Sequence, residues 1–511
     1  ILYFTVVFHM NNYDKFLSHI LKCKDKFINK INKKNRLVFI ITHHDADGIS
    51  AGSIVSLCLK RQGIPFQTRV INQISEKYLG TVILDSRNQD DKFYIFTDFG
   101  SGQLKFILEN FDPSRVMILD HHEIEELDNG DTGDLIHVNP WMFDIDGATE
   151  ISASGVAYLF AKSLDSNNTN LAPLAIIGSL GDMQDQGNMS SLLGLNRTIL
   201  DDGIKLGLVS ESVDLRFFGR FKRPIHLALS YTTDPFIPGL SGDESACVKF
   251  LQKIKIPLKK GQNGEPRTIS DLSKDEKSKL VSSIIEWSLK YGIDSDSVKN
   301  LIGNIYLLEK EDPLNNLKDV REFASLLNSC GRLGFGGIGV SIAMGDRNDT
   351  FLEGQQIIQE YRKKLSNYIE WVQTTGAIKK MENIQVIEGR DYIEDTMIGT
   401  LTSILMSSKN VSKEFPLIGW SQLKDDPAMV KISSRGFSEL VKKGLDLGKA
   451  IKKTLENMNL DFNGGGHAPA AGTELPKQKL DKFLRLMSKY VSLQLNSKEF
   501  PKKDKGSDLI W

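Results

Sequence analysis

Short apolar runs rich in β-branched and aromatic residues alternate with amphipathic segments along the first third of the chain. Residues 36–42 read RLVFIIT, and the segment 48–63 then carries apolar positions at helical spacing. Similar apolar runs predict further strands at 66–71, 92–99, 115–122 and 134–140. Strands that are apolar on both faces and separated by helices are typical of a parallel sheet covered by helices. The pattern therefore predicts an N-terminal α/β domain with a mainly parallel sheet.

Acids and imidazoles gather where three of these predicted strands end. They are His43, His44, Asp45 and Asp47 after the first strand, Asp98 after the third, and Asp120, His121 and His122 after the fourth. A helix predicted at 171–185 adds Asp182 and Asp185 at its end. Ligands of such sheets bind beyond the carboxyl ends of the strands, so we expect these side chains to meet. Carboxylates in that number repel one another unless cations neutralise them.

Two divalent ions explain this cluster economically. Mixed His and Asp ligation suits Mn²⁺ better than Mg²⁺, which prefers oxygen ligands, although Mg²⁺ is an alternative. Two such ions about 3.5–4 Å apart can activate a bridging water and stabilise a displacement at phosphorus. The competing interpretation is a set of solvated loop charges and helix caps, and it weighs most for His44 and Asp185.

A second, glycine-rich motif reads NGGGHAPAAG at 463–472. Its three glycines let the backbone approach an anion closely, and a histidine and an arginine add donors. The residues are Gly464, Gly465, Gly466, His467 and, on a predicted strand, Arg435. Arginine offers phosphate a planar donor fork. The motif therefore predicts a phosphate-binding site, with a tight turn where only glycine fits as the alternative.

The chain of 511 residues predicts several domains. Their expected order is a helical extension at 1–35, the catalytic domain at 36–230, an inserted, mostly helical region at 231–325, a Gly-rich loop and long connector helix at 326–376, a smaller α/β domain at 377–495, and a Lys-rich tail at 496–511. The Gly-rich segment LNSCGRLGFGG (327–337) could contact substrate through Arg332 or could be a packing turn with a buried thiol. The sequence leaves both interpretations open.

The net charge and the cysteine content argue against several classes of protein. The net charge of −1 gives no global positive field, so any surface for nucleic acid must be local. The four cysteines have no paired spacing, which fits a reducing cytoplasm and argues against a disulfide framework or a zinc site. No apolar run approaches the roughly 20 residues of a membrane span. The opening ILYFTVVFHM lacks a basic leader, and Met10 is a candidate true start.

The motifs together carry a resemblance to a known family. HHDADG, TDFG, LDHHE and GSLGDMQD resemble the four motifs of the DHH phosphoesterase superfamily. NGGGHAPAAG and KISSRG resemble the glycine-rich motif and basic strand of the associated DHHA1 domain. In this order they resemble RecJ-like single-strand nucleases, and LNSCGRLGFGG resembles the archaeal branch of that family.

The resemblance implies a role for each residue. His43 and Asp45 would hold the first metal, with Asp98 bridging to the second, although many family members carry another residue where His43 stands. The second metal would be held by Asp47, His121 and Asp182. The resemblance further implies that His122 lies near the scissile phosphate and that Asp120 orients a neighbouring imidazole. Asp98, Asp120 and His122 are the expected catalytic residues, and the expected substrate-binding residues are Arg435, Gly464, Gly465, Gly466, His467 and Arg332.

The expected function is that of a metal-dependent exonuclease acting on single-stranded DNA or RNA, in DNA repair, replication or RNA trimming. One alternative is a phosphodiesterase of short oligonucleotides or cyclic dinucleotides, because the core motifs are shared with such enzymes. Another is a scaffold factor of a replication complex, because a eukaryotic helicase component resembles the family with a degraded site. The resemblance also implies a GINS-type replication complex as a partner, and no membrane association is expected.

Overall fold

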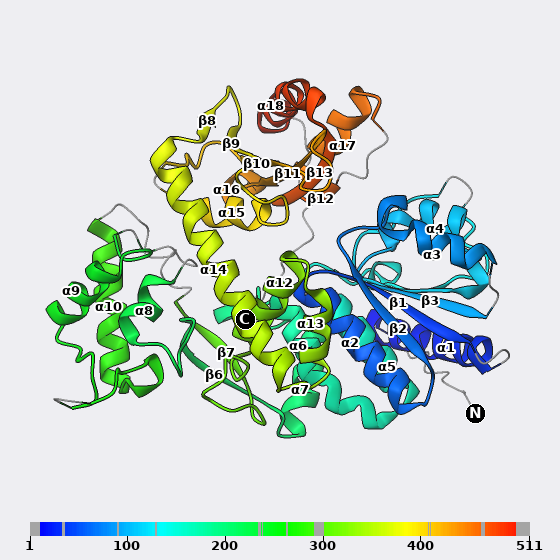
Figure 1. The fold of residues 1–511 in the computed structure, drawn as a ribbon, viewed down its shortest axis with the longest axis horizontal. Helices are drawn as coiled ribbons and strands as arrows, with labels where there is room; N and C mark the ends of the chain where they lie inside the picture. The colour runs from blue at the N-terminus through cyan, green and yellow to red at the C-terminus, as the bar shows by residue number, and fades with distance from the viewer. Residues whose placement is uncertain are drawn as a thin grey trace, which may run out of the picture. The chain divides into compact units, whose positions relative to one another are not determined.

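The computed structural model divides the chain into two compact units, Ile1–Tyr361 and Arg362–Trp511 (Figure 1). Each unit is described by itself. The residues that the structure describes are 11–32, 36–88, 91–127, 130–232, 237, 239–261, 264–290, 301–406, 408, 410–460 and 465–496.

Five parallel strands form the first sheet, in the order β2-β1-β3-β4-β5. Their bounds are β1 Leu37–His43, β2 Phe66–Ile71, β3 Lys92–Thr97, β4 Val116–Leu119 and β5 Ile136–Val138. This confirms the prediction of a parallel α/β domain. The strands end a few residues earlier than expected at β3, β4 and β5, because the polar residues that follow turn away from the sheet to form the site described below.

Side chains of the central strands alternate between two apolar cores, one on each face of the sheet. Val38 and Ile40 pack on one face with three helices, and Ile41 packs on the other with two. The first face is covered by α1 (Asn12–Asn32), α2 (Ala46–Arg61) and α5 (Ala153–Leu164), and the second by α3 (Glu76–Asn88) and α4 (Leu104–Asn110). Each large apolar side chain that is fully buried in this way contributes about 1.5–3 kcal/mol to folding.

Four further helices close the first core around α2. They are α6 (Ala172–Gly181), α7 (Gly194–Lys205), α12 (Val320–Arg332) and α13 (Gly336–Ala343). The Gly-rich stretch 327–337, which the sequence suggested to be a loop, forms the end of α12, a turn and the start of α13. Its glycines let α12 lie directly against the segment that follows β1, since a Cβ on Gly331 would stand 1.5 Å from the His44 carbonyl oxygen.

A small module with its own core is inserted between two paired strands. The strands β6 (Val209–Leu215) and β7 (Ile302–Leu308) are antiparallel, with Leu215 opposite Ile302. The helices between them are α8 (Ile225–Ser230), α9 (Glu244–Lys253) and α10 (Lys274–Lys290). Their apolar side chains form a cluster separate from the main core. The predicted inserted region 231–325 overlaps this module.

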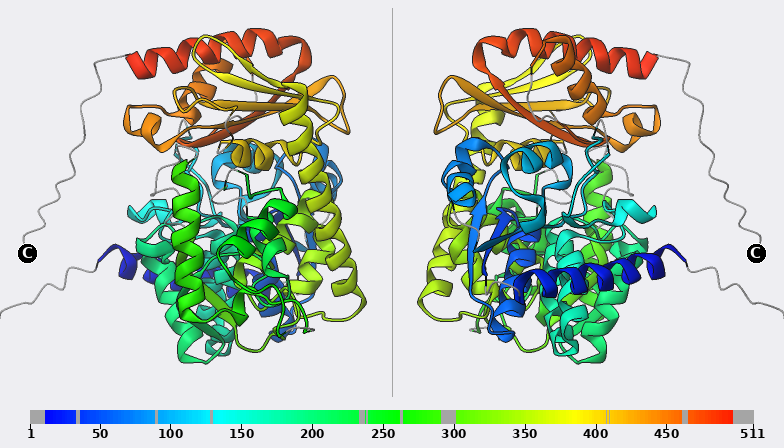
Figure 2. Two further views of the ribbon diagram at one scale, coloured as in Figure 1. Left: turned by 90° about the vertical axis from the view of Figure 1, so that its left-hand side faces the viewer. Right: turned by 90° about the vertical axis from the view of Figure 1, so that its right-hand side faces the viewer.

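The second unit is built on a mixed sheet in the order β12-β13-β11-β10-β9-β8. Its strands are β8 Ile378–Lys380, β9 Gln385–Arg390, β10 Leu417–Gln422, β11 Met429–Arg435, β12 Gly465–His467 and β13 Ala470–Pro476. The long helix α14 (Asp349–Thr375) enters the unit, and the remaining helices are α15 (Ile398–Leu405), α16 (Ser438–Lys442), α17 (Leu447–Asn457) and α18 (Leu480–Asn496). Figure 2 shows α18, in red, lying across one face of this sheet. The structure thus has the smaller α/β domain that the sequence predicted.

Within the described ranges, no helix combines the length and the apolar character that a membrane span requires.

Candidate metal centre

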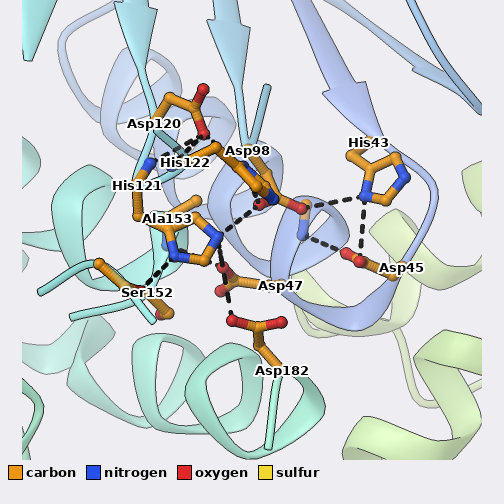
Figure 3. A network of polar contacts seen from close by, with 12 residues as sticks. His43, Asp45, Asp47, Asp98, Asp120, His121, His122, Ser152, Ala153 and Asp182 are labelled. Atoms are coloured by element: carbon orange, nitrogen blue, oxygen red, sulfur yellow. Dashed lines mark hydrogen bonds and ion pairs between the residues drawn. The ribbon is translucent and has the colours of Figure 1, made fainter. Parts of the chain in front are cut away.

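The carboxyl ends of β1, β3 and β4 meet at one edge of the first sheet and carry the predicted acids and imidazoles (Figure 3). His43 is the last residue of β1, and Asp45 caps α2 by accepting the Gly48 N–H at 2.9 Å. Asp98 follows β3 with a left-handed backbone (φ 65°), a conformation that Asp tolerates better than most residues. The short turn from strand to helix therefore concentrates polar side chains at this edge.

Asp98 lies at the middle of the cluster and faces both sides of it. Its Oδ2 is 3.1 Å from His43 Nδ1, and its Oδ1 is 3.3 Å from His121 Nε2. In Figure 3, His43 and Asp45 stand on one side of this carboxylate and Asp47, His121 and Asp182 on the other. A carboxylate that presents one oxygen to each of two groups has the geometry of a bridging ligand.

Two sets of three side chains could each hold a metal ion. One comprises His43, Asp45 and Asp98, the other Asp47, His121 and Asp182, and the donor atoms of each set lie within 4.8 Å of one another. The mixed nitrogen and oxygen donors fit Mn²⁺, and the carboxylates are also ligands for Mg²⁺. These sets are the ones that the resemblance implies, and the assignment of a metal to each stays a proposal.

The charge of the cluster favours cations. Burial, and after it the charge of Asp98, raises the pKa of Asp47 to about 7. Burial also raises the pKa of Asp182 to about 6, against the opposing effect of His121. Burial lowers the pKa of His43, but Asp45 and Asp98 outweigh it and raise the value to about 10. Without metal, the cluster thus retains protons at positions where divalent ions would neutralise the same carboxylates.

We expect Mn²⁺ to raise the melting temperature more at about pH 7.5 than at about pH 5.5. Asp47 and Asp182 have folded pKa values of about 7 and about 6, above the value of about 4 for an unfolded chain. Raised carboxyl pKa values contribute stability at low pH that is lost as the pH rises through the folded values. Above these pKa values the two carboxylates have lost their protons, and bound Mn²⁺ would neutralise their charge instead. Melting in EDTA and in Mn²⁺ at both pH values measures this, and an equal Mn²⁺ effect at both would contradict it.

Asp120 organises the turn that follows β4, and its ligand atoms also lie within 4.8 Å of those of Asp98, His121 and His122, a third group that could hold a metal ion. Its buried carboxylate accepts the backbone N–H of Ser101 at 2.9 Å and that of His121 at 2.8 Å. It also accepts Nδ1–H of His122 at 2.8 Å. Asp120 therefore orients the His122 ring, whose side chain is 44% exposed.

The ligand atoms are fixed by residues that sequence reasoning missed. His121 Nδ1 lies 2.6 Å from the Gly147 carbonyl, an acceptor only, so Nδ1 carries the proton and Nε2 faces the acids. Asp47 accepts the backbone N–H groups of Ala153 (2.7 Å) and Ser154 (3.0 Å) at the start of α5. The Asp47 contacts join positions 106 and 107 residues apart, and no local sequence pattern indicates them.

Two side chains after β5 hold the carbonyls of the two histidines. Trp141 Nε1 donates to the His121 carbonyl at 2.9 Å, and Asn139 Nδ2 donates to the His122 carbonyl at 2.9 Å. Asn139 lies near the end of the strand predicted at 134–140, and Trp141 directly follows it. The feature of the sequence that could have indicated their role is an Asn and a Trp at the end of a strand predicted to belong to the site sheet.

The residues that the sequence left doubtful lie outside both ligand sets. The His44 ring packs edge-on against His43, with centroids 4.5 Å apart. Asp185 pairs with Arg216 beyond the end of β6, and its Oδ2 lies 3.9 Å from Arg321 Nη2 on α12. Asp185 is therefore neither a member of a ligand set nor the solvated charge or helix cap of the alternative interpretation, because it forms a buried ion pair.

In the second unit, the structure brings Arg435 beside the glycine-rich turn. Arg435 ends β11, where it is opposite Ala470, and its Nε donates to Ser403 Oγ on α15 at 2.8 Å. Gly466 has φ 136°, and a Cβ there would stand 2.5 Å from the Ala470 carbonyl oxygen, so only glycine fits. His467 follows in β12. Gly465 begins that strand, and Gly464 lies outside the described residues.

Arg332 lies at the end of α12, in the first unit. Its Nη1 donates to the hydroxyl of Tyr361 at 3.0 Å, and the neighbouring Cys330 is fully buried. The segment therefore packs tightly, which was one of the two interpretations that the sequence left open. Its role toward a substrate stays a prediction.

Family models match three parts of the chain. They are the N-terminal domain of the DHH family at residues 37–179, the DHH-CID domain at 217–302 and the DHHA1 domain at 382–493. The second match falls on the module between β6 and β7. The match to the DHH family covers β1 to β5 together with all the residues of both candidate ligand sets except Asp182.

A sequence relative and several solved structures match most of the length of the chain. An uncharacterized protein from Methanocaldococcus jannaschii is 34% identical over 481 residues, covering 94% of this chain and 99% of the relative. CDC45 from Entamoeba histolytica is similar in fold, with a TM-score of 0.60 at 15% identity over 94% of this chain and 99% of that one. RecJ from Thermus thermophilus, in complex with Mn²⁺, has a TM-score of 0.54 at 14% identity. That match covers 93% of this chain and 55% of RecJ.

The three matched domains stand in the order DHH, DHH-CID and DHHA1, and the site lies at the carboxyl ends of the strands in the first of them. The acids and imidazoles of that site form a cluster that can bind metal. The chain therefore belongs to the DHH/DHHA1 phosphoesterase superfamily, and its fold is similar to that of RecJ.

Proposed function

We propose that this protein is a two-metal exonuclease that hydrolyses phosphodiester bonds at an end of single-stranded DNA or RNA. The observation that carries the proposal is the pair of adjacent ligand sets, with the Asp98 carboxylate of the first set also lying 3.3 Å from His121 of the second. When bound, two divalent ions supply a nucleophilic water at neutral pH and stabilise the charge that develops on the phosphate. Mn²⁺ is the proposed ion, with Mg²⁺ as the alternative.

The chain's own residues divide the remaining work. His43 and Asp45 would hold the first ion, Asp47, His121 and Asp182 the second. Asp98 would lie between them. His122 is exposed and oriented by Asp120, so its free Nε2 can donate a hydrogen bond to a phosphate oxygen. The proposed setting is DNA repair, replication or RNA trimming in the cytoplasm, where buried, unpaired cysteines like the four found here are usual.

The second unit is proposed to hold the nucleic-acid backbone. Arg435 donates to Ser403 Oγ and to the Ser434 carbonyl, and these contacts fix its fork beside the turn that contains Gly466 and His467. A fixed guanidinium and close-packed backbone are a suitable site for phosphate. This site would add binding energy and take no part in the chemistry.

One assay tests the proposal directly. The purified full-length protein is incubated with Mn²⁺ and with end-labelled single-stranded DNA and RNA of several lengths. Stepwise shortening from one end, which stops in EDTA, is the expected result. Cleavage of dinucleotides or cyclic dinucleotides alone would replace the exonuclease by a small-molecule phosphodiesterase.

A scaffold function in a replication complex is the second candidate. It is favoured by the fold likeness to CDC45. The two complete ligand sets favour catalysis instead, because a purely structural protein needs no convergent buried acids. Absence of turnover on every substrate with Mn²⁺, together with stable binding of a GINS-type complex, would favour the scaffold.

Arg435→Ala is expected to raise the apparent KM about tenfold for long strands and to leave dinucleotides nearly unaffected. A charge-assisted hydrogen bond is worth about 1.5–3 kcal/mol, and the lost phosphate contact should also flatten the salt dependence. Steady-state kinetics on both substrate lengths measure the effect. Arg485→Ala on α18 is the matched control, since Arg485 is exposed and bonds only its own helix among the contacts described. An equal penalty at every length would contradict the proposed role.

A further inference from the structure

A buried pair of amides lies behind the second ligand set, Asp47, His121 and Asp182. Gln184 is fully buried, and its Nε2 lies 2.8 Å from Asp182 Oδ2 and 2.8 Å from the Gly147 carbonyl oxygen. Its Oε1 accepts a hydrogen bond from Asn196 Nδ2 at 2.6 Å. Asn196 lies on α7 and is fully buried as well.

The hydrogen-bond partners of Asn196 and Gln184 determine which side of each amide carries the oxygen and which the NH₂ group. The Ser152 backbone N–H, which can only donate, faces Asn196 Oδ1 at 3.4 Å, and Ser179 Oγ donates to the same oxygen at 2.9 Å. Asn196 must therefore turn its NH₂ toward Gln184, which accepts with Oε1. The NH₂ of Gln184 is left facing the Asp182 carboxylate and the Gly147 carbonyl, both of which accept.

The same hydrogen-bond network includes a group that supports each of the three side chains of the second ligand set. Gln184 bonds Asp182 directly, and the Gly147 carbonyl that it bonds also accepts Nδ1–H of His121 at 2.6 Å. At its other end, Ser152 caps α5, whose first N–H groups bind Asp47. One continuous chain of hydrogen bonds thus links the supports of all three side chains.

Another buried amide shows what a purely structural role looks like. Asn168 is also fully buried, and its Nδ2 donates to the Ala161 carbonyl and to Cys58 Sγ. Neither partner belongs to a ligand set or supports one. Gln184 differs because both acceptors of its NH₂ are tied to the cluster.

We propose that Gln184, turned by Asn196, is a positioning residue that sets how tightly the second ligand set binds a divalent ion. The inference deepens the proposed function and rests on its two-metal centre. Without the donor, the Asp182 carboxylate can rotate and the Gly147 carbonyl loses one of its two anchors. Loss of such an outer-shell partner typically lowers metal affinity about 10- to 100-fold.

The test uses the full-length protein and Mn²⁺ alone, without nucleic acid. Gln184→Met keeps the length and approximate volume of the side chain and removes the donor. We expect wild type to bind two Mn²⁺ ions in calorimetry and to give the EPR signal of a spin-coupled pair. The Gln184→Met protein should bind one ion normally and the second about 10- to 100-fold more weakly. The coupled EPR signal should then vanish at Mn²⁺ concentrations that saturate wild type.

Asn168→Leu is the matched control, because it also removes a fully buried amide from the same unit. It should lower the melting temperature and leave both Mn²⁺ affinities unchanged. Gln184→Leu serves as a second variant if the methionine protein does not fold. Unchanged binding of both ions by a folded Gln184 variant would overturn the inference. An equal loss of Mn²⁺ affinity in the Asn168→Leu control would overturn it as well. Neither result would contradict the proposed function. Fewer than two ions on wild type would instead overturn the proposed function.

Discussion

Asp98→Asn should abolish turnover and leave the fold intact. The wild-type carboxylate offers one oxygen to each ligand set, whereas an amide offers only one oxygen in all. We expect turnover to fall at least about a thousandfold, which corresponds to ~4 kcal/mol of activation free energy. Asparagine accepts the left-handed backbone at this position (φ 65°) as well as aspartate does. The loss is measured with end-labelled single strands at saturating Mn²⁺.

Stability provides the first check on this variant. The substitution removes a negative charge that repels Asp47 but also one that pairs with His43 and His121, so the metal-free protein should stay folded in EDTA with only a modest change in melting temperature. His44→Ala is the matched control, since His44 touches His43 but lies in neither ligand set, and its turnover should stay within about tenfold of wild type. Turnover of Asp98→Asn within about tenfold of wild type would refute the bridging role. A loss in His44→Ala as deep as that expected for Asp98→Asn would show that the other histidine of the pair is the ligand.

Gly331→Ala is expected to lower turnover about a hundredfold without touching a ligand. A Cβ at this position would stand 1.5 Å from the His44 carbonyl oxygen, so α12 or the turn after β1 must move. That turn carries His43 and Asp45, and it is also held by Asn328, whose Oδ1 accepts the Ala46 N–H at 3.0 Å. Displacing reacting groups by about 1 Å can cost about a hundredfold in rate. Turnover and Mn²⁺ affinity should fall together.

Gly337→Ala gives the matched control for this prediction. Gly337 lies in α13, the next helix, and a Cβ there would meet nothing within 4 Å. The substitution should preserve turnover and raise stability by about 0.4–1 kcal/mol, because it restricts the unfolded chain. Normal Mn²⁺ affinity in Gly331→Ala would mean that the turn does not depend on this close approach.

The acids and imidazoles could be predicted because their signal is local. Most of them follow an apolar strand closely, as Asp98 follows β3, and parallel strands present their ends to one edge, while Asp182 ends an apolar helix. The supports could not be predicted in this way. Asp47 is held by Ala153 and Ser154, and Gln184 is turned by Asn196, a partner that only the folded helices bring near. Such contacts depend on tertiary packing, which the spacing of residues does not encode.

The structural role of the glycines in the segment 327–337 could not be predicted from the sequence, for a related reason. The composition of 327–337 is equally typical of a flexible loop and of a helix that packs against backbone. The structure has the second case at Gly331, where the missing side chain makes room for the His44 carbonyl. Gly466, in contrast, needs its glycine for a left-handed backbone, as the motif NGGGHAPAAG indicated.

The pairing of Leu215 with Ile302 bears on how a chain of this kind could have been assembled. The polypeptide leaves the main fold along β6 and returns along β7 at the same point, and the described helices between them share a core of their own. Strand partners directly opposite each other have Cα atoms only about 5 Å apart, a gap that a two-residue hairpin can close. The module could thus be added, exchanged or removed as a unit, in evolution or by protein engineering, without a change in the sheet that carries the acidic residues.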